Sequence, residues 1–240
     1  MKKGIYLILC IFFIGLNNAS AQDINQYDNQ GQRHGTWKKK FEGTDQLRYE
    51  GQFNHGEEVG LFKFYKLIKK RSVLTATKQY NDNDNIAEVK FYSSRGKVIS
   101  EGKMIAKFFI GKWVYYHNNS DKIMTIEHYD DDGNLKGERL VYYENGRVAE
   151  RANYYRGKLE GESFWYSEKS GKVVKAFIYK DDMLHGVAKY YNDYGELIAE
   201  GRYHNDKKTG IWRYYKNGNV IDKKDFTVYS KNPKKQKKSN

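Results

Sequence analysis

The stretch Gly210-Ile211-Trp212-Arg213-Tyr214-Tyr215-Lys216-Asn217-Gly218 carries the pattern that decides the fold of this 240-residue chain. Its tyrosine pair belongs to a series of adjacent aromatic pairs spaced by about 25 residues, and a fixed period of that length indicates a stacked-repeat architecture. The seven pairs are Phe64-Tyr65, Phe91-Tyr92, Tyr115-Tyr116, Tyr142-Tyr143, Trp165-Tyr166, Tyr190-Tyr191 and Tyr214-Tyr215.

A glycine precedes most of the pairs by a few residues. These glycines are Gly60, Gly111, Gly137, Gly161, Gly186 and Gly210, with Gly35 opening an earlier unit. One unit lacks this glycine, and we place Asn85 at its position. Ala87 then takes the position two residues after the glycine, where Trp113 and Trp212 stand in their units. With this unit included, we count eight units.

Each unit is predicted to be one β-hairpin. The residues from Gly111 to Tyr116 form a short aromatic and β-branched run, which is typical of a strand. Turn residues follow such runs at Arg95-Gly96, Asn145-Gly146, Tyr194-Gly195 and Asn217-Gly218. Asn-Gly between two strands predicts a type I′ turn, in which both central residues have positive φ. A second strand is marked by Phe53, Met104, Tyr129, Tyr154, Tyr179 and Tyr203.

The predicted fold class is all-β, an elongated single-layer antiparallel sheet of tandem hairpins. Eight hairpins would give a sheet on the order of 80 Å long. Because adjacent residues of a strand point to opposite faces, each aromatic pair places one ring on either face. The second unit departs from the pattern at residues 66–71 and 81–85, which we predict to be an irregular loop or bulge.

The N-terminal residues predict export. Lys2 and Lys3, an apolar run over residues 5–16, and Ala19-Ser20-Ala21 are typical of a signal peptide over residues 1–21. No later run approaches the roughly 20 apolar residues of a transmembrane helix, so the mature chain is expected in the periplasm or outside the cell. Residues 22–30 would be a lead-in, 31–230 the repeat domain, and 231–240 a flexible basic tail.

Cysteine usage and charge restrict the possible functions. Cys10 is the only cysteine and lies inside the predicted signal peptide, so the mature chain has no disulfide and no thiolate chemistry. The formal net charge is +13, which favours acidic partner surfaces. Export argues against nucleic acid as the partner. The tail lysines are Lys231, Lys234, Lys235, Lys237 and Lys238, which would either remain solvated or contact an anionic surface.

Several residues resemble a known repeat. The stretch from Tyr49-Glu50-Gly51 to Gly60 resembles the MORN repeat (membrane occupation and recognition nexus), and residues 200–212 match it nearly as well. A Tyr-Tyr pair followed by Asn-Gly resembles the bacterial variant that is often labelled antitoxin-like. The resemblance covers about residues 31–228. It implies a protein-interaction or membrane-associated scaffold with no shared active site.

Candidate metal and catalytic groups fit turns better than sites. In Asp130-Asp131-Asp132-Gly133 the EF-hand register fails, because His128 and Arg139 occupy positions that need carboxylates. His34, His55 and His185 each precede a glycine, and we expect them to lie too far apart to share a metal. Gly-x-Ser-x-Gly is absent. The sequence therefore predicts no catalytic residue, no cofactor and no metal.

The aromatic stripes are the strongest candidates for function. Their rings either cover one another across strands or leave one face open to a partner. We predict a non-catalytic scaffold that binds a protein along one face. The candidate contacts are Trp37, Trp113, Tyr116, Tyr143, Tyr166, Tyr191, Trp212 and Tyr215. The alternatives are a binder of anionic lipid head groups or polysaccharide through the tail lysines, and an antitoxin-like neutraliser of a partner toxin.

Overall fold

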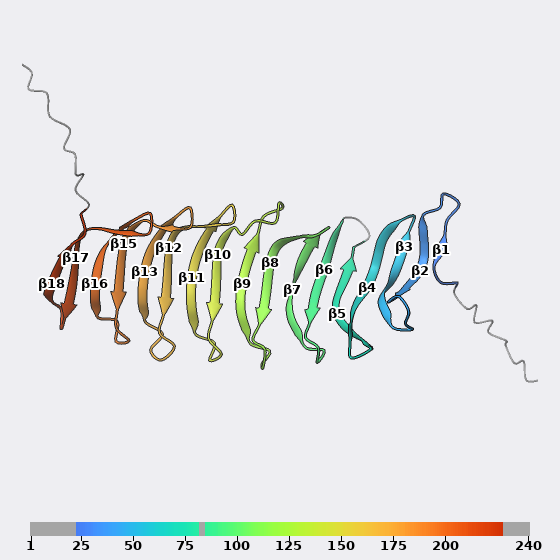
Figure 1. The fold of residues 1–240 in the computed structure, drawn as a ribbon, viewed down its shortest axis with the longest axis horizontal. Coiled ribbons are helices and arrows are strands. Elements are labelled where there is room, and N and C mark those ends of the chain that lie inside the picture. The colour runs from blue at the N-terminus through green and yellow to red at the C-terminus, as the bar shows by residue number, and fades with distance from the viewer. Residues whose placement is uncertain (1–22, 82–84, 228–240) are drawn as a thin grey trace, which may run out of the picture.

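A computed structural model describes residues 23–81 and 85–227, and these form one open antiparallel sheet without helices (Figure 1). The strands are β1 (Gln26–Tyr27), β2 (Arg33–Lys40), β3 (Leu47–Asn54), β4 (Glu57–Ile68), β5 (Arg71–Tyr80), β6 (Ile86–Tyr92), β7 (Val98–Ile105), β8 (Phe108–Tyr116), β9 (Ile123–Tyr129), β10 (Gly137–Tyr142), β11 (Val148–Tyr155), β12 (Lys158–Tyr166), β13 (Val173–Lys180), β14 (Met183–Leu184), β15 (Gly186–Tyr191), β16 (Leu197–His204), β17 (Lys207–Lys216) and β18 (Asn219–Asp225). The predicted elongated β-repeat is therefore confirmed.

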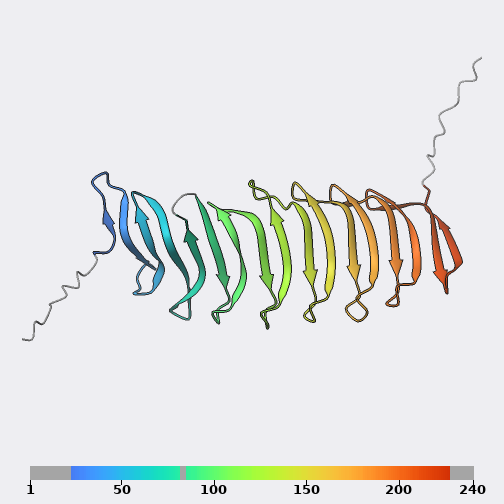
Figure 2. The same ribbon diagram turned by 180° about the vertical axis from the view of Figure 1, so that it is seen from behind.

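Strands pair in the order in which they follow along the chain. Figures 1 and 2 show them side by side from β1 at one end of the sheet to β18 at the other. The short β14 is the one irregularity in the order of strand pairing within the described residues, because β13 pairs with both β14 and β15. The predicted signal peptide and basic tail lie outside the described residues.

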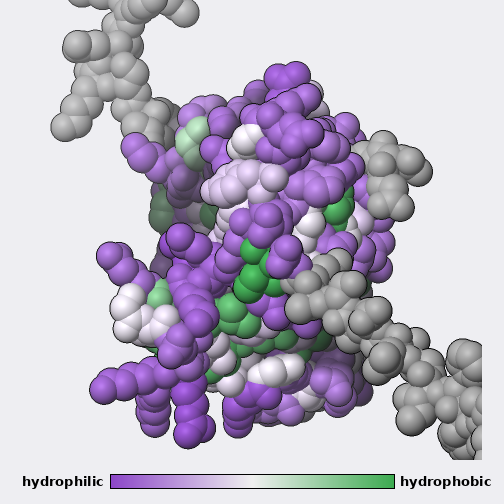
Figure 3. Space-filling model, turned by 90° about the vertical axis from the view of Figure 1, so that its right-hand side faces the viewer, coloured by the Kyte–Doolittle hydropathy of each residue, from purple (hydrophilic) through white to green (hydrophobic). Residues whose placement is uncertain are grey.

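One face of the sheet carries the aromatic core. In most units the first ring of the pair packs there, together with the residue two positions before it. The buried residues of the three clusters are Trp37, Phe53 and Phe62; Ala87, Val89, Met104 and Trp113; and Phe177, Ala188 and Trp212. Seen toward the β1 end, apolar side chains lie in the middle and hydrophilic ones around them (Figure 3).

Large rings are buried in a single layer because they lie against glycine backbone. A Cβ at Gly102 would sit 2.5 Å from the indole of Trp113, and one at Gly201 would sit 2.2 Å from Trp212. Phe62 lies on Gly51 in the same way. Neither Gly102 nor Gly201 has a positive φ, so the close approach of the ring, and not the turn, requires glycine there.

The repeat glycines have a different role, because they form β-bulges. Gly111 and Gly161 have positive φ and lie where the pairing register shifts. In β6 the pairing with β5 runs without a shift from Ala87 to Phe91, and Val89 lies opposite Gly102 of β7. Val89, and not Ala87, therefore holds the position that Trp113 holds in its unit. Our placement of Asn85 as the missing glycine was wrong by two residues, because β6 has no bulge in its pairing with the preceding strand β5.

The turns lie along two edges of the sheet, which we call the loop edge and the tight-turn edge. The loop edge holds the turns near residues 41–46, 69–70, 93–97, 117–122, 143–147, 167–172, 192–196 and 217–218. The tight-turn edge holds two-residue turns with positive φ at both positions, at His55-Gly56, Arg156-Gly157, Asp181-Asp182 and Asn205-Asp206.

The turn predicted at Asn217-Gly218 is confirmed, with φ of 50° and 78°. At Asn145-Gly146 the prediction of a type I′ turn was wrong. Only Gly146 has positive φ there, and the loop closes by hydrogen bonds from Gly146 N to the Tyr143 carbonyl and from Tyr143 N to the Arg147 carbonyl. The extra residue explains the difference, because a type I′ turn accommodates two loop residues.

The irregular loop predicted at residues 66–71 was also wrong. β4 and β5 pair as far as Ile68 and Arg71, and Lys69 and Lys70 form a two-residue turn with φ of 46° and 63°. Pairing of the β-branched and apolar residues on both strands outweighs the cost of positive φ at two lysines. Residues 82–84 of the other predicted loop lie outside the described residues.

Hydrogen bonds join consecutive hairpins at both edges. On the loop edge, a basic side chain near the end of one turn donates to a main-chain carbonyl of the next. Lys122 Nζ reaches the Glu144 carbonyl at 2.7 Å, and Lys172 Nζ reaches the Tyr194 carbonyl at 2.7 Å. On the tight-turn edge backbone amides join consecutive hairpins, as Gly157 N does by donating to the Leu135 carbonyl at 2.9 Å. The hairpins are thus held in fixed register along the sheet.

The contact of ring with glycine gives the first prediction. Gly102→Ala should lower the free energy of unfolding by about 1–3 kcal/mol, because the added methyl collides with the Trp113 ring. In a Trp113→Leu background the same change should cost clearly less, since the smaller side chain can give way. Urea unfolding of the four variants measures this. An equal cost in both backgrounds would contradict the account.

Candidate functional site

The face opposite the core carries a tyrosine row. We use this name for the seven tyrosines Tyr65, Tyr92, Tyr116, Tyr142, Tyr166, Tyr191 and Tyr215, one at the loop-edge end of each successive hairpin strand from β4 to β17. In each, the pairing register shifts immediately before the tyrosine. All seven are half-buried. The row therefore keeps aromatic surface in contact with solvent.

Three hydroxyls of the row, those of Tyr65, Tyr116 and Tyr215, are bonded to carboxylates. Tyr65 donates to Glu50 Oε1 at 2.7 Å and Tyr215 donates to Glu200 Oε1 at 2.7 Å. Tyr116 donates to Glu101, which also forms an ion pair with Lys90 at 3.0 Å. These tyrosines tie the row to carboxylates of the neighbouring strand.

The same contacts shift pKa values. The hydrogen bond from Tyr65 lowers the pKa of Glu50, and the hydrogen bond from Tyr116 lowers that of Glu101. Burial and then Glu50 raise the pKa of Tyr65 to about 12. The bond to Glu101 and then burial raise the pKa of Tyr116 to about 12. Each pair is thus most stable with a charged carboxylate and a neutral phenol.

From β10 to β15 the hydroxyls of the row are free. Within the described residues, Tyr142, Tyr166 and Tyr191 have no hydrogen-bond partner for their side-chain oxygens. They stand on consecutive hairpins. Three unoccupied phenol groups side by side are donors and acceptors that a bound partner could use.

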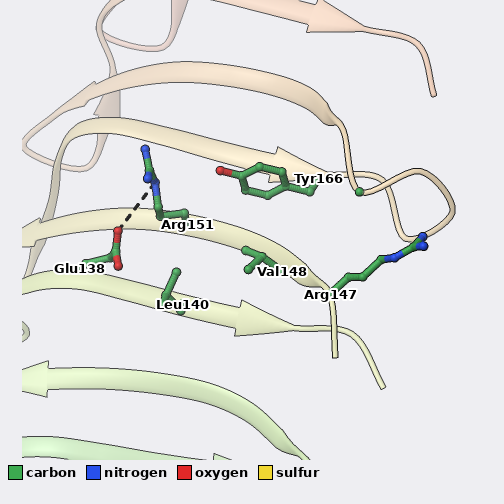
Figure 4. Close-up of a pocket in the computed structure, with 7 residues that line it drawn as sticks. Glu138, Leu140, Arg147, Val148, Arg151 and Tyr166 are labelled. Carbon is green, nitrogen blue, oxygen red and sulfur yellow. Dashed lines mark ion pairs between the residues drawn. The ribbon is translucent and has the colours of Figure 1, made fainter. Parts of the chain in front are cut away.

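Two hollows flank Tyr166. The first has a volume of about 470 Å³ and lies over β10 to β12 (Figure 4). Leu140 and Val148 form its apolar wall, and the Tyr166 hydroxyl points toward Arg151 across it. The second, of about 310 Å³, shares Tyr166 and includes Val174. We call Tyr142, Tyr166, Tyr191 and these hollows the central tyrosine site.

Arg151 supplies a positive charge at the first hollow. Its guanidinium lies 4.9 Å from the centre of the Phe164 ring and 3.7 Å from Glu138 Oε2. Both partners of this ion pair are more than two-fifths exposed, so the pair itself is worth little. Arg151 is therefore held in place by an aromatic ring while it remains able to meet an acidic group.

The candidate tryptophans belong to the core. Trp113 and Trp212 are 0% and 1% exposed, and Trp37 is 8% exposed. Their ring N–H groups are also occupied, each donating to a main-chain carbonyl, as Trp113 does to Lys103 at 2.9 Å. A partner on the surface cannot reach these rings, so we do not carry them into the proposed contact surface.

Tyr143 does not belong to the row. β10 ends at Tyr142, and Tyr143 N begins the turn by bonding to the Arg147 carbonyl, as His117 N does to the Lys122 carbonyl. Tyr142 takes the place that Tyr116 has in its own unit, and Val141 takes that of Tyr115. The signal that could have revealed this is the spacing from Gly137 to its pair, which is one residue longer than the spacing from Gly111.

The acidic cluster forms a turn, and the histidines form two close pairs, His34 with His55 and His185 with His204. Asp130 Oδ1 accepts hydrogen bonds from the backbone of Asp132 and Asn134, which is a turn geometry. The expected separation of the imidazoles was wrong for His34 and His55, whose ring centres are 4.8 Å apart because β2 and β3 are neighbours. No group of three or more His, Cys, Asp or Glu that could hold a metal ion occurs in the described ranges.

Arg139 interrupts the aromatic core beneath the central site. It occupies the position of the tryptophan in its unit and bonds to Glu127 Oε1 at 3.0 Å and Glu150 Oε1 at 3.3 Å. The three side chains are 13% to 25% exposed. This ionic group separates the cluster around Trp113 from the cluster around Trp212.

Comparisons with known proteins give little guidance. No family model matches the chain, and no curated protein matches it. Among solved structures it is similar to a mutant of S. aureus TarM in complex with fondaparinux, α-GlcNAc-glycerol and UDP. That similarity has 16% identity over 44% of this chain and 18% of the other, with a TM-score of 0.18, and it carries no argument about fold or function. Within the described part of the chain, no helix is long and apolar enough to cross a membrane.

The ionic group gives the second prediction. Arg139→Leu should lower the free energy of unfolding by on the order of 2 kcal/mol, because two half-buried carboxylates lose their cation. Adding Glu127→Gln and Glu150→Gln should restore most of this loss, since no unpaired charge remains. Urea unfolding at neutral pH compares the variants. A triple variant as unstable as the single one would contradict the assignment.

The tyrosine and glutamate pairs give the third prediction. Unfolded tyrosine titrates near 10, below the folded pKa of Tyr65 and Tyr116, so their contribution to stability should be lost as pH rises from 10 toward 12. Glu50 and Glu101 have lowered pKa values, so their contribution should be lost as pH falls below 4.5. The urea concentration at the midpoint of unfolding should therefore be highest between about pH 4.5 and pH 10. The double variant Tyr65→Phe, Tyr116→Phe should show a smaller alkaline loss than the natural chain.

Proposed function

We propose that this chain is an exported, non-catalytic MORN-like repeat scaffold that binds a protein partner along the tyrosine row. The observation that carries the proposal is the central tyrosine site, where three tyrosines on consecutive hairpins have free hydroxyls and two hollows flank the middle one, Tyr166. Tyrosine and arginine are, with tryptophan, the residues enriched at the energetic centre of protein interfaces. The site combines both on one rigid sheet.

The chemistry of the site suggests which partner segment would fit. Leu140 and Val148 offer an apolar wall, and Arg151 stands beside them with an exposed guanidinium. A segment with an apolar side chain for the hollow and a carboxylate for Arg151 would satisfy both. The free hydroxyls of Tyr142 and Tyr191 could then bond to the backbone of that segment. We infer a polypeptide partner with an acidic and apolar contact segment.

The sequence pattern supports the remaining parts of the proposal. The resemblance of residues 49–60 to the MORN repeat favours a scaffold role, and residues 1–21 favour export. The antitoxin-like label of the bacterial variant is compatible with the same surface, since a neutralised toxin would itself be a protein partner. The proposal requires no chemical step by any residue of the chain.

The fourth prediction tests this surface. Tyr166→Ala and Tyr191→Ala should each weaken partner binding roughly tenfold, because each removes an anchor ring at the centre of the row. Tyr155→Ala is the matched control, since Tyr155 is 59% exposed but lies at the tight-turn edge. Affinity capture from the native envelope identifies the partner, and calorimetry with that partner measures the affinities.

The proposal fails if folded Tyr166→Ala and Tyr191→Ala retain the affinity of the natural chain. It also fails if Tyr155→Ala loses as much affinity as they do, because binding would then not follow the row. Circular dichroism and thermal unfolding establish that each variant is folded before binding is compared.

A further inference from the structure

Seven basic side chains gather on the loop edge at the N-terminal third of the sheet. We call them the basic corner, and they are Lys39, Arg48, Lys66, Lys69, Lys70, Arg71 and Arg95. All seven are exposed, and none forms an ion pair within the described residues. They come from three successive turns and the strand ends beside them.

Little negative charge balances this corner. Asp45 is engaged by Lys40 at 2.8 Å, and Glu42 is the only other acidic residue between positions 39 and 48. Residues 66–71 and 93–97 contain none. In later turns of the same edge, at 117–122, 143–147 and 192–196, acidic residues equal or outnumber basic ones, whereas the turn at 167–172 holds Lys169 and Lys172 against Glu168. The basic corner is therefore the part of the edge where basic residues are most concentrated.

The structure holds the corner together. Ser72 Oγ donates to the Leu47 carbonyl at 2.6 Å, and Ser72 N donates to Gln46 Oε1 at 2.7 Å, which fixes the β4–β5 turn against the β2–β3 turn. β5 pairs in turn with β6, which leads into the turn containing Arg95. With two strands for each hairpin, the three turns follow one another at about 10 Å. The charges thus form a line along one edge.

We propose that the basic corner binds a linear acidic polysaccharide. A line of unpaired ammonium and guanidinium groups complements the carboxylates or sulfates repeated along such a chain. Insertion into a bilayer would need exposed apolar side chains, but Leu67, at 36% exposure, is the only large exposed hydrophobic residue at these turns. Single-stranded nucleic acid would need exposed rings for stacking. The rings at these strand ends, Tyr65 and Tyr92, are half-buried, and their hydroxyls are bonded to Glu50 and Thr77.

The corner is separate from the central tyrosine site, which begins at β10. The two surfaces would let one molecule hold a polysaccharide and a protein at the same time. This inference does not depend on the proposed protein partner, since no residue of the corner belongs to the tyrosine row.

The test uses the full chain and polygalacturonate as the probe. The triple variant Lys69→Gln, Lys70→Gln, Arg71→Gln should bind it roughly tenfold more weakly in affinity electrophoresis, because three charges at the centre of the line are lost. The matched control is Lys169→Gln, Lys180→Gln, Lys216→Gln, which removes the same charge from exposed positions elsewhere. The control should bind within about twofold of the natural chain at the same ionic strength.

Three results would overturn the inference. The first is an equal loss in both triple variants, which would make binding a matter of net charge. The second is full retention in the corner variant, which would place binding outside the corner. The third is stronger binding to phosphatidylserine vesicles or to single-stranded DNA than to polygalacturonate. Unchanged thermal midpoints for both variants show that the sheet is intact when binding is compared.

Discussion

A ring lying flat on the glycine backbone of the neighbouring strand is the contact on which the sheet depends. An open single layer has no second sheet to cover its apolar side, yet Trp113 and Trp212 are almost fully buried. Glycine at 102 and 201 lets each indole sink onto the strand beside it, where other rings close around it. The bulge glycines and the bonds between turns then bend and align the hairpins around these contacts.

The aromatic residues on one face of the sheet form the core, and those on the other face, the tyrosine row, remain in contact with solvent. The first ring of most pairs and the tryptophans are used by the core, and the second ring faces the opposite side. There the neighbouring strand decides what the tyrosine does. Where Glu50, Glu101 or Glu200 stands opposite, the hydroxyl is occupied, and where no such carboxylate is present, as at Tyr166, it is free. The candidate site is thus a local departure from a repeated structural contact.

The repeat period, the hairpins and the alternation of faces could be predicted from sequence, because each depends on residue type at a fixed spacing. What could not be predicted depends on register. Tyr142-Tyr143 has the same two residues as Tyr115-Tyr116, but it is shifted by one position in its unit. The sequence therefore predicted the turn residue Tyr143 as a contact in place of the row residue Tyr142. Val89 replaces an indole without any glycine before it. The sequence also did not show which aromatic side chains are exposed, because the tryptophans that were predicted as contacts fill the core.

Pairing of each strand only with its neighbours in the chain also shapes how this protein can fold and change. Contacts between residues distant in sequence are not needed, so a partly folded chain can grow by adding one hairpin at a time. Gain or loss of a whole unit would alter the length of the ribbon and leave the interior units as they are. A lineage could therefore adjust the distance between two bound molecules by duplication, without redesigning either binding surface.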